Sequence, residues 1–166
     1  MMGAGKTTIG KVLSRKLDKL FIDTDHEIVR RTGVAIPTIF DIEGEDGFRT
    51  REHSVLEELV QMDNVVLATG GGIVLQEVNR QLLKSNGIVV YLRAGVHDIW
   101  ERTRHDRSRP LLQTDNPQEV IKTLYEKRDP LYSECAHISI DTSNQSVHHL
   151  VNSIVHKINN FSRRPL

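Results

Sequence analysis

Residues 3–8 read GAGKTT and run directly into a helical apolar pattern over residues 8–17. They match the second half of the pattern GxxxxGK(S/T), whose glycines let successive backbone N–H groups close around phosphate oxygens. In this pattern Lys6 offsets phosphate charge, the Thr7 hydroxyl can ligate magnesium, and the helix N-terminus adds its dipole. A plain flexible turn does not require lysine and threonine in this register. The stretch therefore predicts a loop that binds nucleotide phosphates.

The phosphate loop is only half present in this sequence. The first glycine of the pattern would fall immediately before Met1, and no buried strand precedes the loop. A central strand cannot be removed cheaply from a parallel sheet, because each unpaired backbone group on its neighbours costs about 1 to 3 kcal/mol. We therefore expect the chain to be N-terminally truncated and to lack the first strand of its fold.

Short apolar runs alternate with helical patterns along the rest of the chain. β-branched runs predict buried strands at residues 20–22, 65–68, 88–92 and 137–140. Helical patterns cover residues 8–17, 26–31, 45–62, 76–84, 96–104, 117–128 and 147–158. This order is typical of a mostly parallel sheet covered by helices on both faces, with ligand sites at the carboxyl ends of the strands. No linker or repeat divides residues 1–166, so we expect one α/β domain.

The composition favours small-molecule partners. Lys plus Arg equals Asp plus Glu at 22 each, so the charge balance gives no reason to expect nucleic acid or an anionic membrane as a partner. Cys135 is the single cysteine, and no apolar run approaches the roughly 20 residues that span a bilayer. We expect a cytoplasmic monomer. Residues 102–116, rich in arginine and without periodicity, are expected to form a mobile lid.

Two acids follow the first predicted strand, in the sequence DTD at residues 23–25. In an extended segment, side chains at i and i+2 point to the same side, so Asp23 and Asp25 could serve one magnesium ion and one hydroxyl. Asp25 alone could instead cap the helix that starts at residue 26. Because both acids lie at a strand end, we favour a ligand site.

Arginines and glycines supply the remaining candidate residues. Arg49 and Arg51 lie in the early turns of a helix, where the dipole disfavours cations, and a substrate carboxylate would explain Arg49 best. Glycines at 70–72 follow a strand and allow backbone N–H groups to approach a ligand. Arg109 and Arg128 each lie within two residues of a proline, in segments that we expect not to be regular helix.

In order, GAGKTT, DTD, GEDGFRTRE at 44–52, ATGGG at 68–72, RPLL at 109–112 and RDPLY at 128–132 resemble shikimate kinase over essentially the whole chain. The resemblance implies a three-layer sandwich of the P-loop nucleoside-monophosphate-kinase type. It also implies transfer of a phosphoryl group from ATP to the 3-hydroxyl of shikimate, on the route to chorismate and the aromatic amino acids.

The resemblance assigns roles residue by residue. ATP would be held by Gly3, Ala4, Gly5, Lys6, Thr7, Thr8, Arg109 of the lid and Gln145 in the SNQS segment at 143–146. Mg²⁺ would be held by Thr7, with Asp23 reaching it through water. Shikimate would be bound by Asp25, Arg49, Gly71 and Arg128, with the two arginines on its carboxylate. The expected catalytic residues are Lys6, Asp25 and Arg109.

Three alternatives remain open at this stage. A gluconate kinase shares the phosphate loop but is not expected to carry Asp25, Arg49, ATGGG and Arg128 together. A nucleoside monophosphate kinase needs an apolar or aromatic slot for a second base, and only 5% of the residues are aromatic. Because the phosphate loop is incomplete, the chain could also be a non-catalytic nucleotide-binding remnant.

Overall fold

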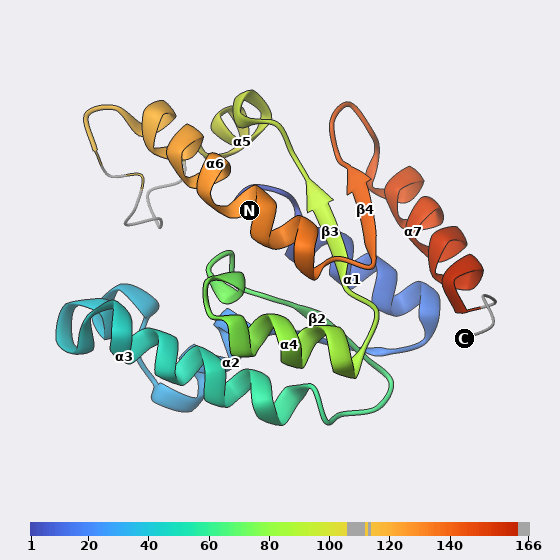
Figure 1. The fold of residues 1–166 in the computed structure, drawn as a ribbon, viewed down its shortest axis with the longest axis horizontal. Coiled ribbons are helices and arrows are strands. Elements are labelled where there is room, and N and C mark those ends of the chain that lie inside the picture. Colours follow the sequence, from blue (N-terminus) through green and yellow to red (C-terminus); the bar gives the residue numbers. More distant parts are fainter. Residues whose placement is uncertain (106–111, 113, 163–166) are drawn as a thin grey trace.

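A computed structural model describes residues 1–105, 112 and 114–162 of the chain (Figure 1). Its strands are β1 (Leu20–Asp23), β2 (Val65–Ala68), β3 (Val90–Arg93) and β4 (Ile138–Asp141). Its helices are α1 (Lys6–Leu17), α2 (Thr24–Thr32), α3 (Ile36–Leu59), η1 (Ile73–Leu75), α4 (Glu77–Asn86), α5 (Val96–Thr103), α6 (Pro117–Cys135) and α7 (Val147–Ser162). The alternating α/β order is confirmed, and each predicted strand lies within two residues of an observed one.

All four described strands run parallel to their partners. β1 pairs with β2, placing Asp23 opposite Ala68, and β3 pairs with β4, placing Val90 opposite Ile138. Within the described residues the strands form two separate two-stranded sheets, because no ladder of hydrogen bonds joins β2 to β3. The predicted parallel arrangement is confirmed. The carboxyl ends of β1 and β2 meet at the acid Asp23 and the start of the glycine cluster.

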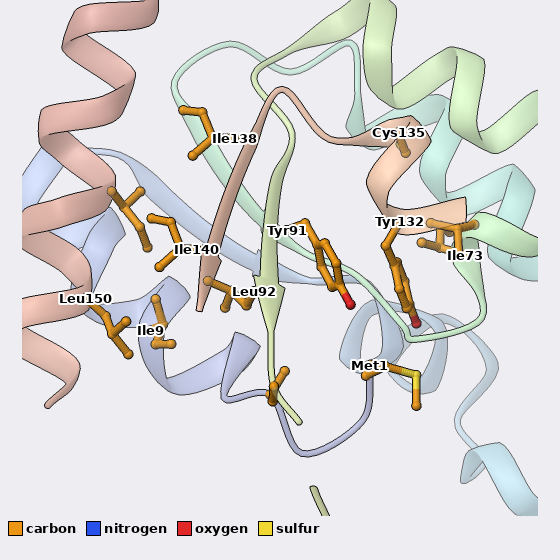
Figure 2. Packing of buried hydrophobic residues seen from close by; sticks show 14 of the residues in the cluster. Met1, Ile9, Ile73, Tyr91, Leu92, Tyr132, Cys135, Ile138, Ile140 and Leu150 are labelled. Atoms are coloured by element: carbon orange, nitrogen blue, oxygen red, sulfur yellow. The ribbon is translucent and has the colours of Figure 1, made fainter. Parts of the chain in front are cut away.

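Helices cover the strands from two sides. Buried residues of α1 and α7, including Ile9 and Ile154, pack on one face, and η1 and α6 supply Ile73 and Tyr132 to the other part of the same core. Figure 2 shows the rings of Tyr91 and Tyr132 side by side, and their centroids are 4.9 Å apart. A smaller core under α2 and α3 consists of Ile28, Ile39, Phe48, Val55 and Leu59. It holds the ring of Phe48, the residue next to Arg49, in place.

Helix α6 is longer than the sequence predicts. This helix continues past Arg128 and through Pro130 to Cys135, so the expectation that Arg128 lies outside regular helix is wrong. A proline inside a helix costs about 3 kcal/mol or more, because its N–H is missing and its ring crowds the preceding turn. Tyr132 and Cys135 are buried in the main core. Their burial holds the last turns in helical form despite the proline.

The segments around the two acids and around Arg49 also differ from the prediction. Helix α2 begins at Thr24, and the Asp23 carboxylate caps it by accepting hydrogen bonds from the backbone N–H groups of Asp25 and His26. Asp25 is therefore not the cap, and it lies in the first turn of the helix rather than in an extended segment. Helix α3 begins at Ile36 and is interrupted at Gly44, whose φ of 71° breaks the helical path before Arg49.

Two further expectations concern the lid and membrane-spanning helices. In the predicted lid, Arg102 and Thr103 end α5, whereas residues 106–111 and 113 lie outside the described residues. None of the described helices is both long enough and apolar enough to cross a membrane.

Candidate active site

The glycine loop leads directly into the N-terminus of α1. Gly3 and Gly5 adopt φ values of 67° and 86°, which residues with a Cβ rarely adopt. Gly5 is the N-cap of α1, no described side chain caps this helix, and its first turn contains no acid. The N-terminus of α1, with the positive end of its dipole, is therefore suited to bind an anion such as phosphate.

Lys6 and Thr7 connect this loop to its surroundings. The Lys6 ammonium donates a hydrogen bond to the Met1 carbonyl over 2.7 Å, which folds its side chain back over the loop. The Thr7 hydroxyl donates to Asp23 Oδ2, also over 2.7 Å, and so links α1 to the end of β1. The two residues that the resemblance places at one magnesium ion are thus neighbours in the structure.

This hydroxyl and carboxylate fit the chemistry of Mg²⁺. Magnesium takes oxygen ligands, keeps several waters and is usually held by one or two protein groups together with substrate phosphates. Thr7 and Asp23 supply oxygen ligands next to the phosphate loop. Elsewhere in the described chain there is no group of three His, Cys, Asp or Glu side chains that could form an all-protein metal site.

Asp25 places a buried carboxylate at the carboxyl ends of β1 and β2. Its Oδ1 atom is buried and has no hydrogen-bond partner within the described structure. Burial raises the pKa of this carboxyl above its ordinary value of 3.8, and the nearby Asp23 carboxylate raises the pKa further. Buried polar atoms are normally paired in folded proteins, so an unpaired oxygen here indicates a position where a ligand donates a hydrogen bond.

Arg49 is held beside this acid by an ion pair with Glu52. The Arg49 guanidinium donates to Glu52 Oε2 over 2.6 Å and to Glu45 Oε1 over 3.0 Å, and its side chain is 11% exposed. Burial raises the pKa of Glu52, which is fully buried and whose Oε1 atom has no hydrogen-bond partner. Arg51 instead pairs with Glu43 at the surface.

The glycine cluster makes room for these side chains. A Cβ on Gly70 would lie 2.7 Å from both Asp25 Oδ1 and Glu52 Oε1. A Cβ on Gly72 would overlap the Arg49 guanidinium. These two glycines are therefore required by the close packing of an acid and a cation against the backbone, whereas the sequence suggested only ligand access.

Arg128 approaches the same cluster from α6. It is 5% exposed, and its Nε atom is a buried donor without a partner in the described residues. One turn further along α6, the Tyr132 hydroxyl donates to the Gly71 carbonyl, and burial raises the pKa of this tyrosine to about 12. A Cβ on Gly71 would lie 3.8 Å from Arg128 Nη1, so the arginine lies directly beside this glycine.

Three buried polar atoms without partners thus surround one short loop. They belong to Asp25, Glu52 and Arg128, and they come from α2, α3 and α6 respectively. The Met1 carbonyl that Lys6 contacts leads into the phosphate loop next to Gly71, since a Cβ on Gly71 would lie 3.5 Å from the Met2 nitrogen. A small molecule bound here would lie next to the phosphate loop and would meet cations and acids together.

The nucleotide end of the site is organised by Arg102, which the sequence did not single out. Its guanidinium donates to the Gly3 carbonyl over 3.2 Å and to the Thr142 hydroxyl over 3.3 Å, joining the glycine loop to the segment after β4. Gln145 lies in that segment, is exposed, and donates to the Asp141 carbonyl over 3.0 Å. Arg109 lies outside the described residues.

Sequence reasoning missed Glu52 and Tyr132, each of which lies one helical turn after an arginine that it did predict. Glu52 follows Arg49 by three residues, and Tyr132 follows Arg128 by four, so each pair lies on one helix face. The spacing was a usable signal for Glu52, which ends the GEDGFRTRE stretch. For Tyr132 the signal was hidden, because Pro130 argued against a helix. No sequence signal marked Arg102, whose partners lie far away along the chain.

Parallel α/β topology, a glycine loop opening α1 and a cluster of acids and cations beside it define a small-molecule kinase of the P-loop class. A family model described as "SKI: Shikimate kinase" matches residues 2–159. The chain therefore belongs to the shikimate kinase family.

Curated relatives and solved structures agree with this assignment. A shikimate kinase of Burkholderia thailandensis is 57% identical over 155 residues, covering 93% of this chain and 84% of the relative. One of Aromatoleum aromaticum is 51% identical, covering 99% of this chain and 94% of the relative.

Two solved structures show how far the fold is shared. A structure of shikimate kinase from Acinetobacter baumannii in complex with shikimate has a TM-score of 0.95 and 48% identity, covering 98% of this chain and 91% of that one. A shikimate kinase structure from Aquifex aeolicus has a TM-score of 0.85 and 34% identity, covering 98% and 95%. The P-loop α/β fold implied by the resemblance is thereby confirmed.

Proposed function

We propose that this chain transfers the γ-phosphoryl group of ATP to the 3-hydroxyl of shikimate, a step on the route to the aromatic amino acids. Membership of the shikimate kinase family supports this reaction. The observation that carries it is the set of unpaired buried atoms on Asp25, Glu52 and Arg128 next to the phosphate loop. A substrate that bears one carboxylate and several hydroxyls supplies the hydrogen-bond acceptors and donors that these three buried side chains lack.

On the nucleotide side, the first amides of α1 bind phosphate oxygens and Lys6 leaves the Met1 carbonyl to offset β/γ charge. Gly3, Ala4, Gly5 and Thr8 complete this cradle, and the resemblance assigns Gln145 as a further nucleotide contact. When bound, Mg²⁺ would neutralise charge that develops on the phosphate oxygens. Thr7 and Asp23 are the residues that would hold it.

On the acceptor side, Arg128 and Arg49 bind the carboxylate of shikimate. Arg128 is a buried guanidinium with an unused donor, and Arg49 is fixed by Glu52, so both cations are oriented before the substrate arrives. The Gly71 N–H donates to a ring oxygen, while the Tyr132 hydroxyl fixes this part of the loop through the Gly71 carbonyl. Binding of the carboxylate thus sets the position of the ring.

Asp25 orients the reacting hydroxyl. Its Oδ1 accepts a hydrogen bond from that hydroxyl, and its raised pKa suits a group that takes up a proton as phosphate transfer proceeds. The transition state of phosphoryl transfer is loose, so positioning contributes more than early removal of the proton. Arg109, assigned on the resemblance alone, would add positive charge near the transferred group from the lid and exclude water.

The acceptor is tested by comparing ATP-dependent phosphorylation of shikimate, gluconate and a nucleoside monophosphate by the purified protein. We expect kcat/KM for shikimate to exceed the values for the other two substrates by at least about a hundredfold. A substrate must pair with two buried cations and one acid, and one that leaves any of them unpaired binds less well. A higher kcat/KM for gluconate would identify gluconate, and not shikimate, as the phosphoryl acceptor. Binding of ATP without turnover on any acceptor would favour a non-catalytic nucleotide-binding protein.

We also propose a cytoplasmic monomer, which light scattering and fractionation would test.

A further inference from the structure

Arg128 lies in a turn of α6 that the helical backbone holds weakly. Pro130 has no N–H to donate to the carbonyl of residue 126, and its ring crowds that carbonyl. Arg128 is nevertheless 5% exposed, and its buried Nε atom must keep one position to meet a ligand. Side chains on neighbouring turns of the helix therefore have to fix the position of this arginine.

Hydrogen bonds join this part of α6 to strand β3. The Tyr91 hydroxyl of β3 donates to Asp129 Oδ1 over 2.8 Å. The other oxygen of this carboxylate, Oδ2, accepts from Arg93 Nη2 of the same strand over 3.0 Å. Arg93 Nε also donates to the Tyr125 hydroxyl over 3.0 Å, one turn earlier in α6. Both oxygens of Asp129 thus bind β3, directly beside Arg128 in the chain.

The ring of Tyr91 makes a second contact with α6. It stacks on the ring of Tyr132, with the two planes 25° apart, and Figure 2 shows both hydroxyls at the same end of the stack. The Tyr132 hydroxyl donates to the Gly71 carbonyl. Burial raises the pKa of Tyr132 and the positive charge of Arg128 opposes this rise, so the guanidinium lies close to that hydroxyl. Tyr91 therefore packs on the residue that lies between Arg128 and the glycine cluster.

The hydroxyl of Tyr91 has a use that packing alone does not explain. Tyr91 is 5% exposed, and a phenylalanine could fill the same space and stack on Tyr132. Only the hydroxyl reaches Asp129. Burial, and then the bond to the Asp129 carboxylate, raise the pKa of Tyr91, so the hydroxyl keeps its proton and remains a donor.

We propose that Tyr91 is a positioning residue for the carboxylate of the phosphoryl acceptor, acting on Arg128 through Asp129 and Tyr132. The proposal rests on the proposed function, because that function assigns Arg128 to the carboxylate of shikimate. β3 pairs with β4 along its whole length, with Tyr91 opposite Ser139, so the strand is a fixed support for α6. An arginine held in place before the substrate arrives loses little conformational freedom on binding.

Tyr91→Phe tests the proposal, because it keeps the stacked ring and removes the hydroxyl. The KM for shikimate should rise by about 10-fold, since a hydrogen bond to a charged group is lost. The kcat and the KM for ATP should stay within about twofold of the parent values, because substrate and transition state lose the same contact. A rise in both KM values by the same factor would assign Tyr91 to general stability and overturn the proposal.

Tyr125→Phe is the matched control. It removes a hydroxyl from the same region of α6, but this hydroxyl contacts Arg93 and leaves the bond between Tyr91 and Asp129 in place. The KM for shikimate in this variant should stay within about twofold of the parent value. Equal KM values for shikimate in Tyr91→Phe and Tyr125→Phe would overturn the proposal.

Two double variants test the route from Tyr91 to Arg128. Asp129→Ala removes the same hydrogen bond from the α6 side, so adding Tyr91→Phe to it should change the KM for shikimate by less than about twofold. Arg128→Lys lacks the Nε donor, and Tyr91→Phe should again add less than about twofold. A further 10-fold rise in either background would show that Tyr91 acts by another route and would overturn the proposal. Asp129→Ala also carries the test if Tyr91→Phe does not fold.

A readout without substrate separates this proposal from the proposed function. The Arg128 Nε–H group is buried, so its proton–nitrogen magnetic resonance signal, assigned by its loss in Arg128→Lys, should exchange slowly with water. Tyr91→Phe should speed this exchange by about 10-fold or more, and Tyr125→Phe should leave it unchanged. Unchanged exchange in Tyr91→Phe would overturn the proposal even if the parent protein phosphorylates shikimate. A parent protein that does not phosphorylate shikimate would refute the proposed function, whereas faster exchange in Tyr91→Phe would still support the hold of Tyr91 on Arg128.

Discussion

Gly72→Ala tests whether Arg49 must lie flat against the glycine cluster. Gly72 has φ of −91° and ψ of −4°, a conformation open to alanine, so the substitution adds no backbone strain. Its Cβ would overlap the Arg49 guanidinium, which must then move away from Glu52. The substitution therefore displaces one of the two cations assigned to the substrate carboxylate without changing any charge.

The size of the effect follows from the contacts that are lost. A hydrogen bond that involves a charged group contributes about 1.5 to 3 kcal/mol. Each 1.4 kcal/mol corresponds to about a tenfold change, so kcat/KM for shikimate should fall by about 10-fold to 150-fold. Glu52, left buried without its partner, should lower the free energy of unfolding by about 1 to 3 kcal/mol.

Steady-state kinetics with shikimate varied at saturating ATP measure this loss, and calorimetry measures the stability. Gly87→Ala is the control, because Gly87 has an extended φ of 174° and a Cβ there meets nothing within 4 Å. The KM for ATP should stay within about twofold of the parent value in both variants. A Gly72→Ala protein whose kcat/KM for shikimate equals that of the control would refute the placement of Arg49.

Further variants separate the two halves of the site and test its electrostatics. Arg128→Ala should raise the KM for shikimate or abolish turnover, while ATP binding measured by titration stays intact; unchanged shikimate kinetics would contradict the assignment. Lys6→Ala should impair transfer to every acceptor, and a loss confined to one acceptor would refute its role on the donor. The pKa of Asp25 in the folded state is raised above its ordinary value of 3.8. Between these two pKa values the folded state binds more protons than the unfolded state, so the free energy of unfolding falls as the pH rises through this range. Asp25→Asn should therefore raise the melting temperature at pH 7 and lose this gain below about pH 4, while slowing turnover; a lower melting temperature at pH 7 would exclude the buried carboxylate described above. Glu52→Gln keeps the shape but removes the charge that holds Arg49, so it should raise the KM for shikimate more than that for ATP, and an equal rise in both would assign Glu52 to general stability.

Local sequence patterns were sufficient for the features that depend on neighbouring residues. The phosphate loop lies within one short segment, and the glycines of that segment are required by local φ values that the structure shows. Asp25 and the glycines at 70–72 were predicted as site residues because they follow strands, and the structure places Asp25 beside Gly70 at the carboxyl ends of β1 and β2. The Arg49 prediction used its unfavourable position near a helix start.

Features that depend on distant packing could not be predicted in this way. The helical course through Pro130 depends on the burial of Tyr132 and Cys135 by residues far away in sequence. The contacts of Arg102 join it to Gly3, 99 residues away. Sequence spacing also gave no reason to expect that Gly72 is required by a guanidinium from α3.

Identification of the reaction product tests the central claim most directly. The protein is incubated with ATP, magnesium and shikimate, and the phosphorylated product is assigned by phosphorus and proton magnetic resonance. The proposed roles of Asp25 and the two arginines predict one product, shikimate phosphorylated on its 3-hydroxyl, formed in equal amount to ADP. Release of ADP with free phosphate, or a phosphate on another hydroxyl, would contradict the account of how the acceptor is held.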